Sequence, residues 1–512
     1  MSIWFRRALL RLLLYPHRLL PTALRRNRDR PAFGDGLPYG RVAERVGALG
    51  AHWRGQGVAP GDRVVVDLPN DPAFVEARLA AILAGAVAVP VPPGSDDRRL
   101  GWIAEVTEAR AYLGPRPEAV PGLAAVPLDP LAGDREAYEG IVAAGTPGGR
   151  PARVGGNDLV TINFTSGTTG EPKGVMSTAA GWGWSLYYAL GENRVPVGGD
   201  EVFLHAIPLA TAGSTLILPA VLSGARSLFL PLWDADRAAE TVEREGVTRI
   251  FLTPTQLAEF VDAVRAGGRD VSSLKSVIYG TEGIPRARIR KALDVLGPVL
   301  QQGYGMAEAL PPVCLLHPDE HAAAAAAGDD EVLGSAGRPT RAVTLRVCDE
   351  EGRALGPGEA GSIRLAGRTL SPGYWKRPDL TAASRRGGLY VTGDVGCLDR
   401  RGYLHVEGRA GRVPSPGARR AVEWAEARPE VCLAWAEEAP GRILLTAVAA
   451  RGREPDLEAL AAGAAGAAAD ARPVEVRLLP QAPKTPSCKL RLPAEPLPSS
   501  PGAEEPKKSR VP

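Results

Sequence analysis

The chain has 512 residues, of which 61 are basic and 58 are acidic, so its formal net charge is only +3. This balance gives no electrostatic basis for binding nucleic acid, and we predict no nucleic-acid partner. Because a single hydrophobic core rarely grows beyond about 250–300 residues, the length predicts more than one domain.

Cysteine usage and hydropathy indicate the compartment. The cysteine count is odd and no Cys-x-x-Cys spacing occurs, which predicts free thiols rather than disulfides or a metal site. The few histidines are scattered and form no apparent ligand cluster. No segment is apolar over the length that a bilayer span needs. We therefore expect a cytoplasmic protein without an integral membrane span.

The first residues, from Trp4 to Tyr15, are basic and apolar. They could begin a signal peptide, but no clear small-residue cleavage site follows the apolar stretch. We favour a helix packed on the domain or a loose start. Peripheral contact of an amphipathic helix with a membrane surface is the alternative.

Helix and strand patterns alternate along roughly the first 300 residues. Apolar residues at near-helical spacing predict a helix over 38–58, and a buried run predicts a strand over Arg63–Leu68. A helix over Phe74–Gly85 and a strand over Ala86–Val91 follow. This alternation predicts a layered α/β architecture with largely parallel strands.

Beyond residue 300 the pattern changes. The six alanines Ala322–Ala327 could form a helix, but between His321 and Gly328 they are interpreted most simply as a surface loop insertion. Short strands separated by glycine-containing turns then predict a small β-rich subdomain, at Leu345–Val347, Ser362–Leu365 and Tyr403–Val406. We expect this subdomain to close the large one.

A domain boundary is expected near Arg409. The fold class is predicted to be α/β, with a large domain over 1–408 and a small, mobile α+β lid over 409–492. Within the lid we expect a strand over Ile443–Ala449 and a helix over Leu457–Ala469. Residues 493–512 lack an apolar pattern and are expected to be a disordered tail.

The segment 159–176 carries the most specific chemical signal. An apolar run predicts a strand, and it ends in a loop of hydroxyls and glycines before Lys173. Backbone N–H groups, hydroxyls and a lysine are the donors that grip ATP phosphates. The candidate phosphate-binding residues are Thr165, Ser166, Gly167, Thr168, Thr169, Gly170 and Lys173.

The spacing of this loop differs from that of the common nucleotide-binding P-loop. That pattern has four residues between its glycines, whereas Gly167 and Gly170 are three positions apart, and Lys173 is followed by Gly174. A flexible surface hairpin is the alternative interpretation for a loop of this composition.

The string Thr165–Gly174 resembles the phosphate loop of the adenylate-forming, or AMP-binding, superfamily. This family includes acyl- and aryl-CoA ligases, peptide-synthetase adenylation domains and luciferases. Further family-like motifs follow in the expected order, at 302–308, 390–394, 402–409 and 483–490. The resemblance covers about residues 30 to 492.

The resemblance implies a role for each matching residue. It implies that Tyr304 stacks on adenine, that Glu308 holds Mg²⁺ and that Asp394 binds the ribose hydroxyls. It places Arg409 at the hinge of the lid. Gly280, Gly305 and Arg409 are the remaining residues that we assign to nucleotide binding.

The implied reaction has two halves. A carboxylate attacks the α-phosphorus of ATP to give acyl-AMP and pyrophosphate, and a thiol then attacks the acyl-AMP. The resemblance assigns catalysis to Lys173, Glu308 and Lys489, with Lys489 on the mobile lid. It implies ATP, Mg²⁺ and coenzyme A, or the phosphopantetheine arm of a separate acyl carrier protein.

The chain departs from the family at three places. Ala307 stands where a threonine usually donates to the AMP phosphate. The hinge loop 411–417 contains two prolines where the family has acidic residues, an isoleucine and a lysine. Cys488 replaces the usual glycine before the catalytic lysine. Gly417 and Arg419 resemble the element that faces the site once the lid has turned.

Substrate residues are expected within 203–220, 279–283 and 303–310, and we assign His205, Thr211, Gly283 and Met306. No aspartate lies between Glu201 and Asp234 to pair with a substrate ammonium. We therefore predict an apolar acyl or aryl carboxylic acid. The alternatives to a CoA ligase are an acyl carrier protein ligase, an adenylation-only or β-lactone-forming enzyme, and a non-catalytic binding protein.

Overall fold

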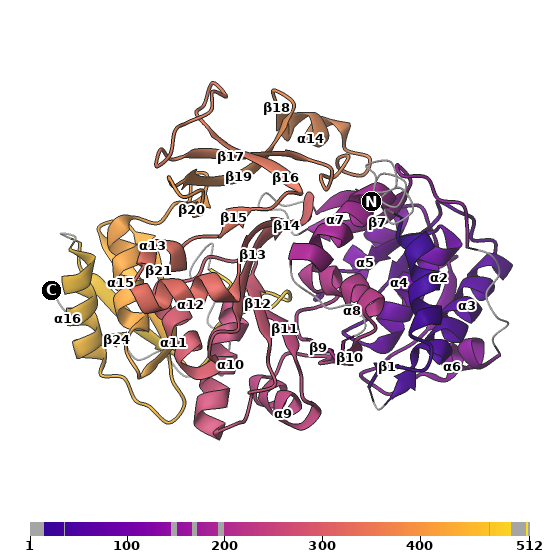
Figure 1. Ribbon diagram of the computed structural model, residues 1–512, viewed down its shortest axis with the longest axis horizontal. Coiled ribbons are helices and arrows are strands. Elements are labelled where there is room, and N and C mark those ends of the chain that lie inside the picture. Colours follow the sequence, from indigo (N-terminus) through magenta and orange to yellow (C-terminus); the bar gives the residue numbers. More distant parts are fainter. Residues whose placement is uncertain are drawn as a thin grey trace, which may run out of the picture.

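The computed structural model describes residues 15–34, 36–144, 151–165, 172–192, 199–469 and 472–492, and the backbone of 508–509. Its four sheets are arranged as a large N-terminal domain with a smaller C-terminal domain (Figure 1). The predicted α/β fold class is therefore confirmed.

The first large sheet has six strands in the order β6-β5-β3-β4-β7-β8. All neighbouring strands are parallel except β7 and β8. Its strands are β3 (Arg63–Val66), β4 (Val87–Pro90), β5 (Ala109–Gly114), β6 (Ala124–Pro127), β7 (Leu159–Thr165) and β8 (Lys173–Thr178).

The second large sheet has nine strands in the order β15-β14-β13-β12-β11-β9-β10-β1-β2. In the part of this order from β13 to β1, each strand is parallel to the strand beside it. Its strands are β1 (Pro31–Phe33), β2 (Leu37–Pro38), β9 (Val202–His205), β10 (Arg226–Phe229), β11 (Arg249–Leu252), β12 (Ser276–Gly280), β13 (Leu300–Met306), β14 (Ala309–Leu316) and β15 (Arg338–Pro339).

Helices cover these two sheets, as the sequence alternation predicts. They are α2 (Pro16–Arg26), α3 (Tyr39–Gly55), α4 (Pro72–Ala84), α5 (Asp97–Val106), α6 (Glu136–Ala143), α7 (Ala179–Glu192), α8 (Ile217–Ser223), α9 (Ala235–Glu245), α10 (Pro254–Gly267) and α11 (Arg286–Leu296). Helix α4 illustrates the local rules, because Asp71 caps its first turn, Pro72 occupies its first position and Gly85 ends it in a left-handed conformation.

The alanine tract is the clearest error of the sequence prediction. Ala322–Ala327 forms the end of α12 (Pro318–Ala327), not a loop insertion. Alanine has the highest helix propensity, and a capping box of His317 and Glu320 starts the helix. One face is buried, where His321 Nε2 lies 2.8 Å from the hydroxyl of Tyr279. The short helix α13 (Asp330–Leu333) follows.

A third, five-stranded sheet forms the predicted β-rich subdomain and lies across the top of Figure 1. It consists of β16 (Val343–Cys348), β17 (Gly361–Gly367), β18 (Arg385–Arg386), β19 (Leu389–Leu398) and β20 (Leu404–Arg409), with helix α14 (Pro378–Ala383) beside it. Strand β20 ends at Arg409, where the sequence predicts the domain boundary.

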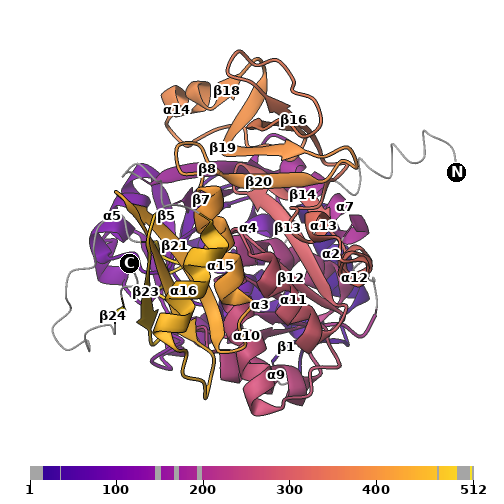
Figure 2. The same cartoon turned by 90° about the vertical axis from the view of Figure 1, so that its left-hand side faces the viewer.

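The C-terminal domain, which faces the viewer in Figure 2, packs two helices against a fourth sheet. Its elements are α15 (Pro416–Glu426), β21 (Val431–Ala439), β22 (Arg442–Ala449), α16 (Leu457–Ala468), β23 (Val474–Leu479) and β24 (Lys508–Ser509). The pairing of β24 with β23 differs from the predicted tail, whose other residues lie outside the described ranges. No helix in the described ranges is long and apolar enough to cross a bilayer.

Candidate active site

The predicted phosphate loop connects β7 to β8. Its ends are fixed, because Thr165 and Lys173 are paired across the two antiparallel strands. Ser166, Gly167, Thr168, Thr169 and Gly170 lie outside the described residues, so their predicted roles stay predictions. The hairpin geometry at these two ends suits either interpretation of the loop.

Lys173 faces the β-rich subdomain. Its Nζ lies 5.7 Å from the centre of the Tyr374 ring, within range of a cation–π contact. The backbones of the two segments are joined as well, since the N–H of Trp375 donates to Gly174 O at 2.7 Å. The lysine is therefore held beside Tyr374 rather than left on an open surface.

Tyr374 connects this lysine to Glu308. Its hydroxyl donates to Glu308 Oε1 at 2.9 Å and lies 3.4 Å from the hydroxyl of Tyr390. Burial, together with the charge of Glu308, raises the pKa of Tyr374 to about 12, so the hydroxyl stays a donor at neutral pH. Glu308 itself stands in the turn between β13 and β14.

Asp394 lies at the centre of a second group. The hydroxyl of Tyr304 donates to its Oδ2 at 2.6 Å, and Arg409 Nε lies 3.1 Å from its Oδ1. Arg409 is the direct cross-strand partner of Asp394 and also donates to Thr392 O at 2.8 Å. Burial, then the Asp394 charge, raises the pKa of Tyr304 above its usual range.

The C-terminal domain contributes a hairpin made of residues 483–491. Its two arms are joined by a bridge between Lys484 and Leu490, and Thr485 N donates to Lys489 O at 2.7 Å. In Figure 1 this yellow segment reaches the middle of the molecule near β12. Pro486 also approaches Gly94, in the loop after β4, so the hairpin touches segments that follow strands of both large sheets.

Lys489 lies just after the turn of this hairpin, opposite Thr485, and is half-buried. Burial lowers the pKa of its ammonium, Glu282 opposes that effect, and Arg409 adds to it. Arg409 faces Tyr374 as well, whose pKa it lowers. Arg409 is thus paired with Asp394, and its charge also acts on Tyr374 and Lys489.

Cys488 adopts a left-handed conformation with φ of +62°. This explains why a glycine is usual at this position, since a side chain there costs about 1–2 kcal/mol. The backbone is held by a contact from the large domain, because Thr253 Oγ1 donates to Cys488 O at 2.8 Å. Burial raises the pKa of the Cys488 thiol to about 11.

A family profile described as AMP-binding enzyme matches residues 20–375, which is more than half of the chain. The chain belongs to this family.

Curated and solved members of the AMP-binding family agree with this assignment. A feruloyl-CoA synthase from Amycolatopsis is 35% identical over 345 residues, which are 65% of this chain and 65% of the synthase. The chain therefore matches just under two thirds of that relative's length. An amide bond synthetase from Marinactinospora thermotolerans has 26% identity and a TM-score of 0.74, covering 92% of this chain and 97% of the synthetase.

An ATP-bound enzyme named MatB from Rhodopseudomonas palustris shares the fold at 22% identity. The two structures superpose with a TM-score of 0.79, over 93% of this chain and 97% of MatB. Such likenesses cover the C-terminal domain as well as the large one, so the resemblance in fold extends past the matched profile.

The nucleotide motifs of this AMP-binding enzyme include backbone that only small residues allow. A Cβ atom on Gly280 would lie 2.1 Å from Gly303 O, so β12 and β13 approach too closely there for any side chain. Gly305 is similarly close to Pro311, at 3.0 Å. This explains two of the predicted glycines by close approach rather than by flexibility.

Two residues beside these glycines escaped the sequence analysis. Thr281 Oγ1 and Gln302 Oε1 are buried and have no hydrogen-bond partner in the described structure. A buried polar atom without a partner is rare and indicates a position that a ligand can satisfy. Gln302 is the first residue of the predicted motif 302–308, and Thr281 lies in the predicted substrate segment 279–283, so these two ranges carried the signal.

The predicted substrate residues lie in unlike surroundings. A Cβ atom on Gly283 would meet no atom within 4 Å, and Thr211 is half-buried. Met306 packs partly against the β-rich subdomain. His205 is buried in the nine-stranded sheet, where it stacks on Phe229 and its Nε2 lies 3.1 Å from Ser227 Oγ. Burial lowers its pKa to about 4, so it is neutral.

The hinge segment contains less strain than its two prolines suggest. Pro416 is the first residue of α15, where the missing N–H would have no helical partner, and Ser415 caps the helix. Gly417 is buried in that helix, and Arg419 is exposed. Only Pro414 then restricts the short connection between Arg409 and the C-terminal domain.

Helix α15 is docked firmly on α11. Glu423 accepts hydrogen bonds from the N–H groups of Arg286 and Ala287, at 2.9 and 3.0 Å, and so caps α11 from the other domain. One turn later, Glu426 pairs with Arg288. These contacts keep the hairpin of Lys489 seated at the site.

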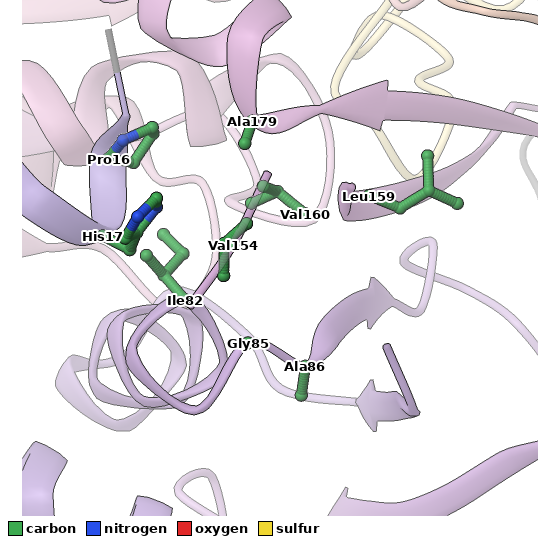
Figure 3. A pocket seen from close by; sticks show the side chains of 9 residues that line it. All are labelled: Pro16, His17, Ile82, Gly85, Ala86, Val154, Leu159, Val160 and Ala179. Atoms are coloured by element: carbon green, nitrogen blue, oxygen red, sulfur yellow. The ribbon is translucent and has the colours of Figure 1, made fainter. Parts of the chain in front are cut away.

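A separate small cavity lies between α2, α4, β7 and α7 (Figure 3). Apolar side chains and His17 line it, and none of the predicted site residues does. It is therefore distinct from the site of Lys173, Glu308, Asp394 and Lys489.

Proposed function

We propose that the chain activates an apolar carboxylic acid with ATP, forming acyl-AMP and pyrophosphate, and then transfers the acyl group to a thiol. The observation that supports this most strongly is the convergence of five segments. Tyr374 contacts Lys173 and Glu308, Tyr304 and Arg409 contact Asp394, and the charge of Arg409 acts on both Tyr374 and Lys489.

ATP would be bound by groups from both large sheets. The phosphates would be bound by the predicted phosphate loop and by the cation of Lys173 at its end. The free lone pairs of Asp394 would accept the ribose hydroxyls. The adenine would lie near Tyr304, with the unpaired oxygens of Gln302 and Thr281 as hydrogen-bonding groups.

Glu308 suits a magnesium ion. Its carboxylate accepts from the hydroxyl of Tyr374 and is also close to that of Tyr390, which leaves further oxygen lone pairs for an ion. In the described ranges, no group of three or more acidic, histidine or cysteine side chains is arranged so that it could hold a metal ion by itself. A single carboxylate with substrate phosphates and water is the usual way in which proteins hold Mg²⁺. When bound there, the ion would neutralise charge on the phosphates.

Lys489 would supply the charge for the first half-reaction. The attacking carboxylate and the α-phosphate are both anions, and they must come together for the acyl C–O–P bond to form as pyrophosphate leaves. A buried ammonium between them stabilises the charge that develops in the transition state. This step needs the C-terminal domain in the docked position described above.

The acid is proposed to be apolar, either aliphatic or aromatic. The segment from Val202 to Trp233 contains no acidic residue. Glu201, which precedes it, is already paired with Arg249 and Lys275 and is not available for a substrate ammonium. Among the family members, the feruloyl-CoA synthase and a fatty-acid–CoA ligase of Mycobacterium tuberculosis act on such acids.

The acceptor is proposed to be coenzyme A. Two relatives whose names include CoA support this acceptor. Another relative, from M. tuberculosis and 28% identical, is named both a salicyl-AMP ligase and a salicyl-S-ArCP synthetase, and the second name refers to a carrier-bound thioester. A separate acyl carrier protein is therefore the second candidate. A β-lactone closed by the substrate's own hydroxyl is the third.

Pyrophosphate exchange with a panel of aliphatic and aromatic acids tests the proposal. We expect ATP-dependent exchange with at least one apolar acid and none with free amino acids. Single-turnover assays would then compare coenzyme A with carrier proteins, and release of AMP without any thiol would favour the lactone. If no acid supports exchange and calorimetry detects no ATP binding, the chain is a ligase-like binding protein instead.

A further inference from the structure

Glu282 lies between the two domains beside Lys489. It lies two residues after the end of β12, and its side chain is half-buried. Thr255, at the start of α10, donates its hydroxyl to Glu282 Oε2 at 3.0 Å. From the other domain, Leu490 N donates to Glu282 Oε1 at 2.7 Å. One carboxylate thus joins the large domain to the residue that follows Lys489.

The charges around this contact are few. Glu282 is the acidic group that faces Lys489, while Arg409 faces the lysine as a like charge. Glu282 is faced by Lys489 and by Arg288, and the guanidinium of Arg288 is already paired with Glu426. The Cys488 thiol and the ion pair of Lys484 with Glu259 are the remaining titratable groups nearby. Lys489 therefore has one counter-charge in the described structure.

The backbone on both sides of this contact is strained. Thr281, immediately before Glu282, has φ of +79°, and Cys488, immediately before Lys489, has φ of +62°. A β-branched residue in this region is a genuine outlier. Such strain persists only where the surrounding structure enforces it, and it clusters at functional sites.

We propose that Glu282 is the positioning residue for Lys489. Its carboxylate seats the hairpin through the N–H of Leu490 and keeps the ammonium of Lys489 protonated beside the substrate. The inference rests on the proposed function for the role of Lys489, but the contact itself can be tested without activity. Burial and Arg409 both favour the neutral amine, so removing Glu282 removes the charge that opposes them.

The test compares Glu282→Gln with Glu259→Gln. Glutamine can still accept from Leu490 N but has no charge. Glu259 is the matched control, because it accepts from Lys484 on the same hairpin at 2.5 Å. The chain has few lysines, so in protein carrying ¹³Cε-lysine the signal of Lys489 can be assigned by its loss in Lys489→Arg.

In Glu282→Gln the pH midpoint of the Lys489 signal should fall by about one unit or more, because an opposite charge nearby shifts a pKa by 1–3 units. Glu259→Gln should leave that midpoint unchanged. The rate of pyrophosphate exchange falls at high pH as Lys489 loses its proton. In Glu282→Gln this fall should move to lower pH by the same amount. At pH values where Lys489 is protonated, exchange should return towards the wild-type rate.

Two results would overturn the proposal. The first is an unchanged pH midpoint of the Lys489 signal in Glu282→Gln. The second is a loss of pyrophosphate exchange that is the same at every pH, which is what a merely structural role of Glu282 predicts. If the wild-type protein shows no exchange with any acid, the proposed function fails. The nuclear magnetic resonance titration still decides the role of Glu282 in that case.

Discussion

Arg288 on α11 and Glu426 on α15 form a buried ion pair across the boundary between the two domains. Their side chains are only 7% and 1% exposed, and the guanidinium donates two hydrogen bonds to the carboxylate. Glu426 also accepts from the N–H of Ala434 at 2.8 Å. Any turn of the C-terminal domain that admits a thiol must separate this pair.

The first prediction concerns this pair. Glu426→Ala should destabilise the protein by about 3–5 kcal/mol, because it leaves the Arg288 charge buried without a partner. Urea unfolding would measure the loss, and proteolysis of the segment 410–416 would report undocking. Arg353→Ala, which removes an exposed ion pair with Asp349, is the control and should leave unfolding unchanged. Equal stability of Glu426→Ala and the wild type would contradict a structural role for the pair.

The second prediction concerns Cys488. Cys488→Gly should relieve the cost of a side chain at φ of +62° and stabilise the docked hairpin by about 1 kcal/mol. Cys488→Val should weaken adenylation, since a β-branched residue tolerates this conformation least. Pyrophosphate exchange and thermal unfolding of the two variants provide the measurement. A valine variant as active as the glycine variant would show that the hairpin relaxes in solution.

The third prediction is a pH dependence of stability. Burial lowers the pKa of His321 to about 4, below its ordinary value near 6.5. The contribution of neutral His321 to the free energy of unfolding is complete above pH 6.5. It is lost as the pH falls towards 4, because the unfolded state binds the proton more strongly than the folded state. The resulting decrease in the free energy of unfolding should approach about 3 kcal/mol. Denaturant unfolding between pH 4 and 7 should show a shallower slope in His321→Gln, and an unchanged slope would contradict the assignment.

Much of this site could be predicted because its residues belong to contiguous motifs. Tyr304, Asp394 and Lys489 are each embedded in strings whose order alone indicates the family. The largely parallel strands within the two large sheets likewise follow from the alternation of helix and strand. The ends of the predicted elements are correct within a few residues, for example at α3 and β22.

The residues that sequence reasoning missed act across long separations. Glu282 has no motif of its own for this role, and its partner Leu490 lies 208 positions away. Glu423 and Glu426 look like ordinary surface charges of an amphipathic helix until α11 covers them. The alanine tract was misassigned because no apolar periodicity marks it, although its capping residues and helix propensity predict a helix.

The role of Lys489 is the central claim, and Lys484 on the same hairpin provides its internal control. Lys484 Nζ lies 2.5 Å from Glu259 Oε1, so its charge serves the docking of the hairpin rather than the substrate. The decisive measurement is pyrophosphate exchange in Lys489→Ala and Lys484→Ala, together with thioester formation from chemically supplied acyl-AMP. Lys489→Ala should cut exchange by at least about 10²-fold, the effect of removing one key transition-state donor, and leave the thioester step nearly unchanged. Lys484→Ala should retain most of both activities. Normal exchange in Lys489→Ala would contradict the proposed role of the lysine and of the domain that presents it.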